Sequence, residues 1–128
     1  MSFRITWLHK PHIIRIQYEG TVTGLDLTQS MQKVLRAVMQ TETYLMLDFS
    51  AIHIVPNDLF SNSLTSQLLN HANTQWCVVI ASQDRNDRNT RLLTQDKIKL
   101  FSQYDSAYAF LIGMLRLDKG IIINQTPS

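Results

Sequence analysis

Three arginines recur at every third position of one polar segment. Arg85, Arg88 and Arg91 stand between a buried apolar run and the next predicted strand, and residues three apart share one side of a helical turn. Guanidinium groups form paired hydrogen bonds with carboxylates and phosphates. The spacing therefore predicts a cationic cluster for an acidic partner or a phosphorylated ligand. The simpler interpretation is a solvated loop with local Asp/Arg pairs, each contributing about 0–1 kcal/mol.

The small positive charge of the chain is concentrated in the same region. Twelve Lys and Arg against ten Asp and Glu give a net charge of +2 over 128 residues. The segment 84–99 holds three Arg and two Lys against three Asp, which is also 5 − 3 = +2. No aromatic residue lies between the three arginines, whereas single-strand binding sites combine basic groups with aromatic rings. We expect no nucleic-acid partner.

A second candidate region opens a predicted helix. Pro56, Asn57 and Asp58 precede the apolar Leu59 and Phe60. Pro, Asn and Asp are ordinary residues for a helix start, and that is the simpler interpretation. Asp58 would also place one fixed negative charge where the helix dipole favours an anion by about 0.3–1 kcal/mol.

No arrangement of residues predicts an enzyme or a metal site. Four glycines cannot build a Gly-x-Ser-x-Gly elbow or a phosphate-binding loop. Asp48 ends an apolar run near the carboxyl edge of the predicted sheet, where α/β proteins place function, but no base accompanies it. We expect Asp48 to cap the following turn, and we expect no catalytic residue, no cofactor and no metal. The histidines fit no zinc spacing; they are His9, His12, His53 and His71.

Composition predicts one domain with a hydrophobic core. The chain is 45% hydrophobic, and 128 residues is the length of one ordinary domain. Cys77 stands in an apolar run and is predicted to be a buried thiol. The amino terminus has no apolar signal region, and the longest apolar stretch, 107–115, is about half of the roughly 20 residues that a spanning helix needs. We expect a cytoplasmic protein with no membrane partner.

Hydrophobic periodicity predicts strands interleaved with helices. Alternation predicts two hairpin strands and a later strand, and continuous apolar runs predict two central strands. Helical spacing predicts one helix capped by Thr23, one that starts at Pro56 and one capped by Asp105 and Ser106. The polar stretch 82–94 has weaker helical spacing. In chain order, the strands are expected at 3–8, 12–18, 44–49, 76–81 and 97–104, and the helices at 26–39, 56–73 and 105–116.

The last predicted helix is apolar nearly all round. Either it is wedged between the sheet and a neighbouring element, or one of its faces meets a second subunit. After it, 120–124 is predicted to form an extra short strand, which could add to a sheet edge in this chain or in a partner. A homodimer is thus one hypothesis that the sequence raises.

The order of these elements resembles the STAS domain, the sulfate transporter and anti-sigma factor antagonist family. The opening turn 18–20 that leads into the first helix, the central run 44–55 and the closing stretch 98–111 each resemble that family. The resemblance covers roughly residues 3 to 115 and implies an α/β, STAS-like sandwich: a mixed four- to five-stranded sheet with about four helices. We expect a single domain over 1–116 and a carboxyl-terminal extension over 117–128.

One position departs from the family pattern. Bacterial members carry an Asp-Ser-x-Gly motif at the second helix, whose serine a partner kinase phosphorylates. Counted without gaps from Asp48, those places hold Pro56, Asn57, Asp58 and Leu59. Asparagine has no hydroxyl group and cannot accept the phosphate. The resemblance therefore implies the fold and the partner-binding surface without a working phosphoserine switch.

The leading hypothesis is a non-enzymatic, regulatory interaction module that binds another protein. Its expected binding surface joins 56–60 to the arginines Arg85, Arg88 and Arg91. The alternative is a small-molecule binder, which would hold an apolar or lipid-like ligand under the last helix, or a nucleotide or anion at the arginine cluster.

Overall fold

The first two strands of the chain pair as a hairpin and begin a five-stranded sheet. The computed structural model describes residues 3–52, 63–81 and 97–120. The sheet order is β1-β2-β3-β4-β5, with β1 antiparallel to β2 and the other neighbours parallel. The predicted α/β class with a mixed sheet is confirmed. The strands are β1 (Phe3–His9), β2 (Ile13–Glu19), β3 (Thr43–Ala51), β4 (Thr74–Ile80) and β5 (Ile98–Phe101).

The alternating pattern of β2 decides which way each of its side chains points. Ile14, Ile16 and Tyr18 are buried in one hydrophobic cluster, whereas Arg15 and Gln17 lie on the opposite face because successive side chains of a strand alternate. The predicted hairpin is confirmed by the pairing of β1 with β2.

Two helices cover the first face of the sheet. α1 (Gly24–Val38) begins at the predicted N-cap, Thr23, whose side-chain oxygen accepts from the backbone N–H of Asp26 at 3.2 Å. α2 (Ser63–Asn70) ends three residues earlier than the predicted 73. It ends before His71, whose Nδ1 accepts from the backbone N–H of Asn73 at 3.0 Å in the turn that leads into β4. The predicted start of this helix at 56–58 lies outside the described residues.

The layer between these helices and the sheet is the larger of two hydrophobic clusters. Cys77 is fully buried in it, as predicted. Tyr18 and Ser30 are also fully buried there, and their hydroxyl oxygens lie 2.7 Å apart in a hydrogen bond that joins β2 to α1. The cluster comprises Phe3, Ile14, Ile16, Tyr18, Leu27, Met31, Val34, Val38, Leu45, Leu47, Phe49, Ile52, Leu68, Leu69, Cys77, Val79, Ala81 and Ile98.

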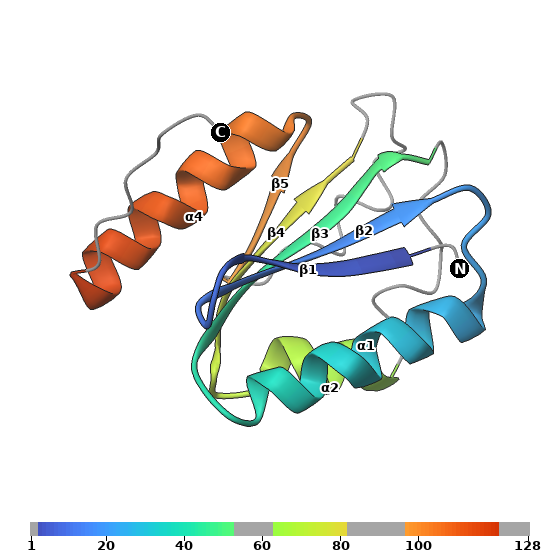
Figure 1. The fold of residues 1–128 in the computed structure, drawn as a ribbon, viewed down its shortest axis with the longest axis horizontal. Coiled ribbons are helices and arrows are strands. Elements are labelled where there is room, and N and C mark those ends of the chain that lie inside the picture. The colour runs from blue at the N-terminus through green and yellow to red at the C-terminus, as the bar shows by residue number, and fades with distance from the viewer. Residues whose placement is uncertain (1–2, 53–62, 82–96, 121–128) are drawn as a thin grey trace.

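The opposite face of the sheet is covered by α4 (Tyr104–Lys119) alone among the described helices. Figure 1 shows α4 on its own side, away from α1 and α2. None of the three described helices is long and apolar enough to cross a membrane. The second cluster comprises Ile13, Tyr44, Met46, Val78, Ile80, Ala107, Leu111, Ile112 and Leu115.

Both predicted ends of α4 were wrong. The N-cap is Gln103, not Asp105 or Ser106, and it makes no side-chain capping bond. Asp105 lies instead in the first turn, where its charge suits the helix dipole. The helix continues to Lys119 and ends at Gly120, whose φ of 68° lies in the left-handed region that glycine tolerates.

One side of α4 is buried against the sheet. It packs on β3, β4 and β5 with its buried residues, while Leu117 near its end is 77% exposed. Toward β2 and β1 the cover by α4 decreases: Ile13 of β2 still lies in the cluster under this helix, whereas Arg4 and Thr6 of β1 are exposed. Gly120, the first residue of the predicted extra strand, is the C-cap of α4, and the rest of that strand, 121–124, lies outside the described residues, as does the weakly helical stretch 82–94.

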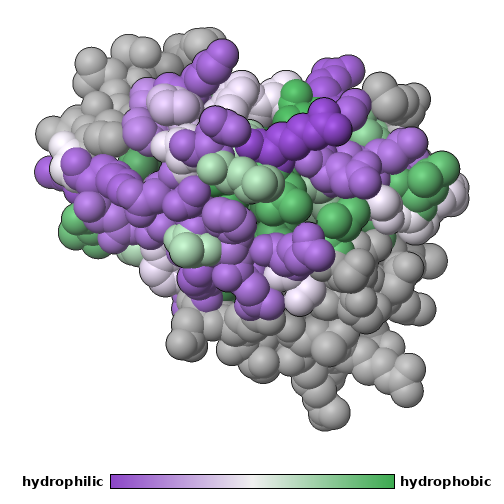
Figure 2. Space-filling model, turned by 90° about the horizontal axis from the view of Figure 1, so that it is seen from below, coloured by the Kyte–Doolittle hydropathy of each residue, from purple (hydrophilic) through white to green (hydrophobic). Residues whose placement is uncertain are grey.

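The two sides of the molecule therefore differ in how they meet solvent. Figure 2 looks onto the side formed by α1 and α2, where hydrophilic residues cover most of the described surface and hydrophobic residues show in smaller areas between them. This is the surface of an ordinary amphipathic helical layer. The other side carries α4 as its one described helix, and the candidate site lies beside that helix on β1, β2 and β3.

Candidate functional site

Polar side chains from three neighbouring strands form one patch beside α4. In the strand register, Arg4 of β1 lies next to Gln17 of β2, which lies next to Asp48 of β3. Thr6 of β1 pairs in the same way with Arg15 of β2. Because residues opposite each other in a sheet share a face, all five project on the α4 side. We call these five residues the polar half-face.

The only carboxylate of the polar half-face is fully engaged. Asp48 is fully buried, and its Oδ2 accepts from Nε of Arg15 at 3.1 Å and forms an ion pair with Nη2 of the same guanidinium. Its Oδ1 accepts from the backbone N–H of Ser50 at 2.9 Å and from the Ser50 hydroxyl at 2.6 Å. The predicted capping of a following turn is wrong, because β3 continues to Ala51 and Ser50 is therefore a residue of the strand itself. The ion pair with Arg15 was not predicted.

These contacts decide the charge state of Asp48. Burial by itself would raise the pKa of this carboxyl, but the hydrogen bonds from Ser50 and Arg15 and the positive charge of Arg15 outweigh it, so the pKa lies below its usual value. A carboxylate with a lowered pKa and occupied oxygens is a weak base. Asp48 therefore stays a carboxylate at neutral pH and positions Arg15 and Ser50.

Arg15 connects the polar half-face to α4. Its guanidinium carbon lies 4.7 Å from the ring centroid of Tyr104, in a cation–π contact. Tyr104 in turn stacks on Tyr108 with centroids 5.8 Å apart and an interplanar angle of 10°. The side chain of Arg15 keeps 22% of its surface exposed. Asp48 and Tyr104 therefore hold the guanidinium in one orientation while part of it still faces solvent.

The other side chains of the patch are accessible to solvent. Arg4 and Thr6 are exposed, and Gln17 is half-buried, so donors and acceptors of four side chains, including Arg15, face solvent on a rigid strand pair. The accessible charge is positive because the carboxylate of Asp48 is buried under its partners. A surface of this kind hydrogen-bonds an anionic or polar partner without any chemical step.

Neither a protein-family model nor a curated protein matches this chain.

All eight residues predicted to bind a partner lie outside the described residues. They belong to the segments that follow β3 and β4, which are parallel neighbours. The described chain stops at Ile52 and resumes at Ser63 around the first segment, and stops at Ala81 and resumes at Lys97 around the second. The eight predictions are Pro56, Asn57, Asp58, Leu59, Phe60, Arg85, Arg88 and Arg91.

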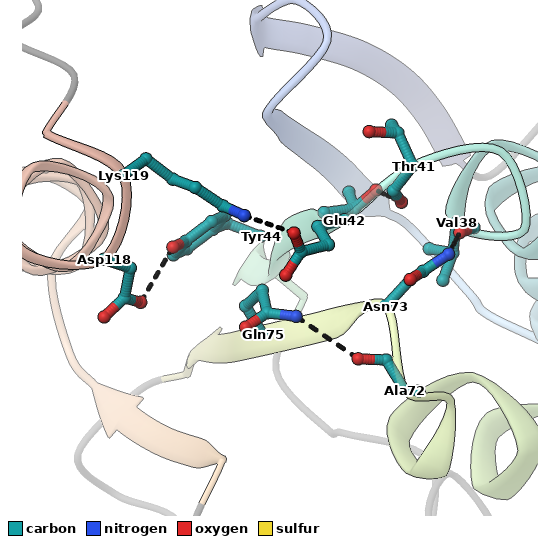
Figure 3. Close-up of polar contacts among 10 residues, drawn as sticks. Val38, Thr41, Glu42, Tyr44, Ala72, Asn73, Gln75, Asp118 and Lys119 are labelled. Carbon is teal, nitrogen blue, oxygen red and sulfur yellow. Dashed lines mark hydrogen bonds and ion pairs between the residues drawn. The ribbon is translucent and has the colours of Figure 1, made fainter.

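A second group of polar contacts lies at the other end of the sheet. The hydroxyl of Tyr44 donates to Oδ2 of Asp118 at 2.8 Å, and Lys119 pairs with Glu42 (Figure 3). Burial raises the pKa of Tyr44, and the hydrogen bond and negative charge of Asp118 raise it further. These contacts tie the end of α4 to the start of β3.

The histidines of the described chain form no metal site. His9 and His12 stack across the hairpin turn with ring centroids 5.4 Å apart, and no group of three or more metal-ligating side chains occurs among the described residues. The pKa of His12 is lowered by burial and by the nearby charges of His9 and Lys119. His53 lies outside the described residues.

Sequence reasoning missed Arg15 as the partner of Asp48. The sequence did contain a signal for this ion pair, since Arg15 stands on the polar side of an alternating strand and Asp48 ends an apolar run. A buried carboxylate needs a cation or several donors. The missing information was the strand order, which places β2 directly beside β3.

Proposed function

We propose that this chain is a non-enzymatic, cytoplasmic interaction module of the STAS-like type that binds another protein. The observation that carries the proposal is the polar half-face, which within the described chain exposes Arg4 and Thr6, holds the guanidinium of Arg15 in place and has a positive accessible charge. The engaged state of Asp48 supports a recognition role over a catalytic one.

The topology agrees with the STAS-like part of the proposal. A hairpin that opens the sheet, parallel strands added in chain order and a last helix alone on one face follow the order of elements that led to the resemblance. Asn57 at the expected phosphoserine position supports constitutive binding without a phosphate switch.

The binding surface that we propose has two parts. One is the polar half-face, and the other comprises the segments 56–60 and 85–91 predicted from the sequence. Both segments follow strands whose carboxyl ends lie at the same edge of the sheet as Asp48, because β3 and β4 are parallel. An acidic partner surface would suit both parts.

The test captures partners on the immobilised protein from its native lysate and identifies them by mass spectrometry. A specific protein should be retained by the wild type and lost with Arg4→Ala and Arg88→Ala. Arg36→Ala removes an exposed arginine from α1, and this matched control should retain it. Loss with Arg36→Ala as well, or retention with all variants, argues against the proposal. A native mass spectrum with a bound small molecule, and no captured protein, would favour the ligand-binding alternative.

A further inference from the structure

The strand β1 has one unpaired edge in the described chain. It is hydrogen-bonded to β2 on one side and to no other described strand. Its pairing with β2 is regular from Phe3 to Trp7 and shifts register only between Trp7 and His9. An edge strand presents free backbone N–H and C=O groups along its outer side, which are ready to pair with another strand.

The two edges of the sheet differ in how well they are protected. β5 has four residues, one of which is the exposed Lys99, and short, charged edges discourage pairing. β1 has seven residues, and its regular part carries one charge, Arg4, and no proline. Trp7 in the same part leaves 37% of its surface exposed. The β1 edge therefore has the features of a pairing edge.

Apolar and polar residues alternate symmetrically about Ile5 in the regular part of β1, so this strand matches a second copy of itself that runs in the opposite direction. We propose that two copies of this chain associate by antiparallel pairing of their β1 strands about a two-fold axis at Ile5. Phe3 then lies opposite the partner's Trp7, and Arg4 lies opposite the partner's Thr6. Apolar residues meet apolar residues on one face and polar residues meet polar residues on the other, as sheet pairing requires.

Other registers are less favourable. If one strand slides by one residue, so that for example Phe3 lies opposite the partner's Thr6, apolar side chains face polar ones. An axis at Arg4 would bring the two guanidinium groups directly opposite each other, which is destabilising. An axis at Thr6 would extend the pairing past Trp7 into the part of β1 where the register shifts. Only the axis at Ile5 pairs the whole regular part, Phe3 to Trp7, with the same part of the second copy.

This pairing joins the polar half-faces of both copies. A two-fold axis perpendicular to the sheet keeps Arg4 and Thr6 of each copy on the same side, so one continuous ten-stranded sheet would carry both patches next to each other. The pairing buries one strand edge per copy, which is small beside the about 1,200–2,000 Å² of a stable interface. The dimer should therefore be weak and reversible, and it does not depend on the identity of the partner protein.

Sedimentation velocity of the full chain over a wide range of concentration tests the proposal. The wild type should show reversible dimerisation. Thr6→Glu places a carboxylate opposite the partner's Arg4 and should tighten the dimer, and Thr6→Arg places two cations opposite each other and should weaken it, each by about two- to thirtyfold for two equivalent pairs. Gln67→Glu and Gln67→Arg make the same charge changes on exposed α2 and should have no effect.

Three results would overturn the inference: a monomer at every concentration, a shift in the same direction for both Thr6 variants, or an equal response to the Gln67 variants. Thermal unfolding of each variant in dilute solution checks that the monomer still folds. Thr6 is exposed, so the fold should tolerate both changes.

Cross-linking supplies a second, independent measurement of the register. Ile5→Cys would place two thiols opposite each other, with Cα atoms about 4.5–5.5 Å apart, which suits a disulfide. Thr6→Cys would face the partner's Arg4 instead. Under a mild thiol oxidant, the first variant should form a covalent dimer and the second should not; the reverse result would refute the axis at Ile5. Cys77 is buried and should not compete.

Discussion

Arg15 and Asp48 lie on neighbouring parallel strands, with Nε of Arg15 3.1 Å from Oδ2 of Asp48. The carboxylate is fully buried, while the guanidinium side chain is 22% exposed. The pair therefore stands where the covered part of the α4 face ends and the polar half-face begins. Asp48 therefore contributes to the stability of the fold and also fixes the position of Arg15 in the candidate site.

Asp48→Asn should lower the free energy of unfolding at neutral pH by about 1–3 kcal/mol. The amide keeps an acceptor for Ser50 but leaves the partly buried Arg15 cation without a counter-ion. Urea denaturation followed by circular dichroism measures the loss. Glu42→Gln removes a carboxylate from the exposed pair with Lys119 and should cost at most about 0.5 kcal/mol. Equal losses for the two variants would contradict this account.

Acid should weaken the fold through the same carboxylate. The pKa of Asp48 is lower in the folded chain than its ordinary value of 3.8, so the unfolded chain binds the proton more readily. The contribution is complete above the unfolded value and is lost as the pH falls through the folded value. Unfolding free energies measured along a pH series should converge for the wild type and Asp48→Asn in acid. A constant gap between them would show that Asp48 does not titrate in this way.

Two leucines of α4 should respond very differently to truncation. Leu111 is fully buried against the sheet, whereas Leu117 is 77% exposed on the same helix. Leu111→Ala removes buried methyl groups and leaves a cavity, which should cost about 2–5 kcal/mol. Leu117→Ala makes the same chemical change and should stay within about 0.5 kcal/mol. Thermal or urea unfolding distinguishes them, and a large loss at Leu117 would mean that the end of α4 is covered.

Alkaline solution should destabilise the protein through two buried tyrosines. Burial raises the pKa of Tyr18 and of Tyr44 above the ordinary value of 10.0. Above pH 10 the unfolded chain loses phenolic protons that the folded chain keeps, so stability falls as the pH rises. The double variant Tyr18→Phe/Tyr44→Phe should flatten this dependence in unfolding measurements. An unchanged slope in the double variant would assign the effect to other groups.

The thiol of Cys77 should be inert in the native protein. Burial raises its pKa to about 12, and thiol reagents attack the thiolate. A chromogenic disulfide reagent should therefore label Cys77 only after denaturant is added. Rapid labelling of the folded chain would show that β4 opens easily. Cys77→Ala, which has no thiol, gives the background of the assay.

Local patterns predicted most of the elements because each is encoded within a few neighbouring residues. The alternation of β2, the capping pair of Thr23 and Asp26 and the continuous apolar run of β3 are all visible in a short window. The ends of α4 were not visible in such a window: Gln103 makes no side-chain capping bond, and the first helical residue, Tyr104, contacts Arg15, which is distant in the chain.

The candidate site was harder to predict for the same reason. Arg4, Thr6, Arg15 and Gln17 were visible as the polar side of two strands, but whether a helix covers that side depends on where α4 lies across the sheet. The partner of Asp48 depends on strand order, which no single window of sequence contains.

The spatial order of the strands is the same as their order along the chain. During synthesis, each new strand therefore finds its neighbour already made, and no gap must be held open for a later one. Only the β1–β2 hairpin closes a short loop, whereas each parallel strand is reached through a longer crossover, and such pairing is slower. The carboxyl-terminal helix arrives last, so β3 and β4 wait with one apolar face uncovered until α4 leaves the ribosome, and that interval is when the nascent chain is most prone to aggregate.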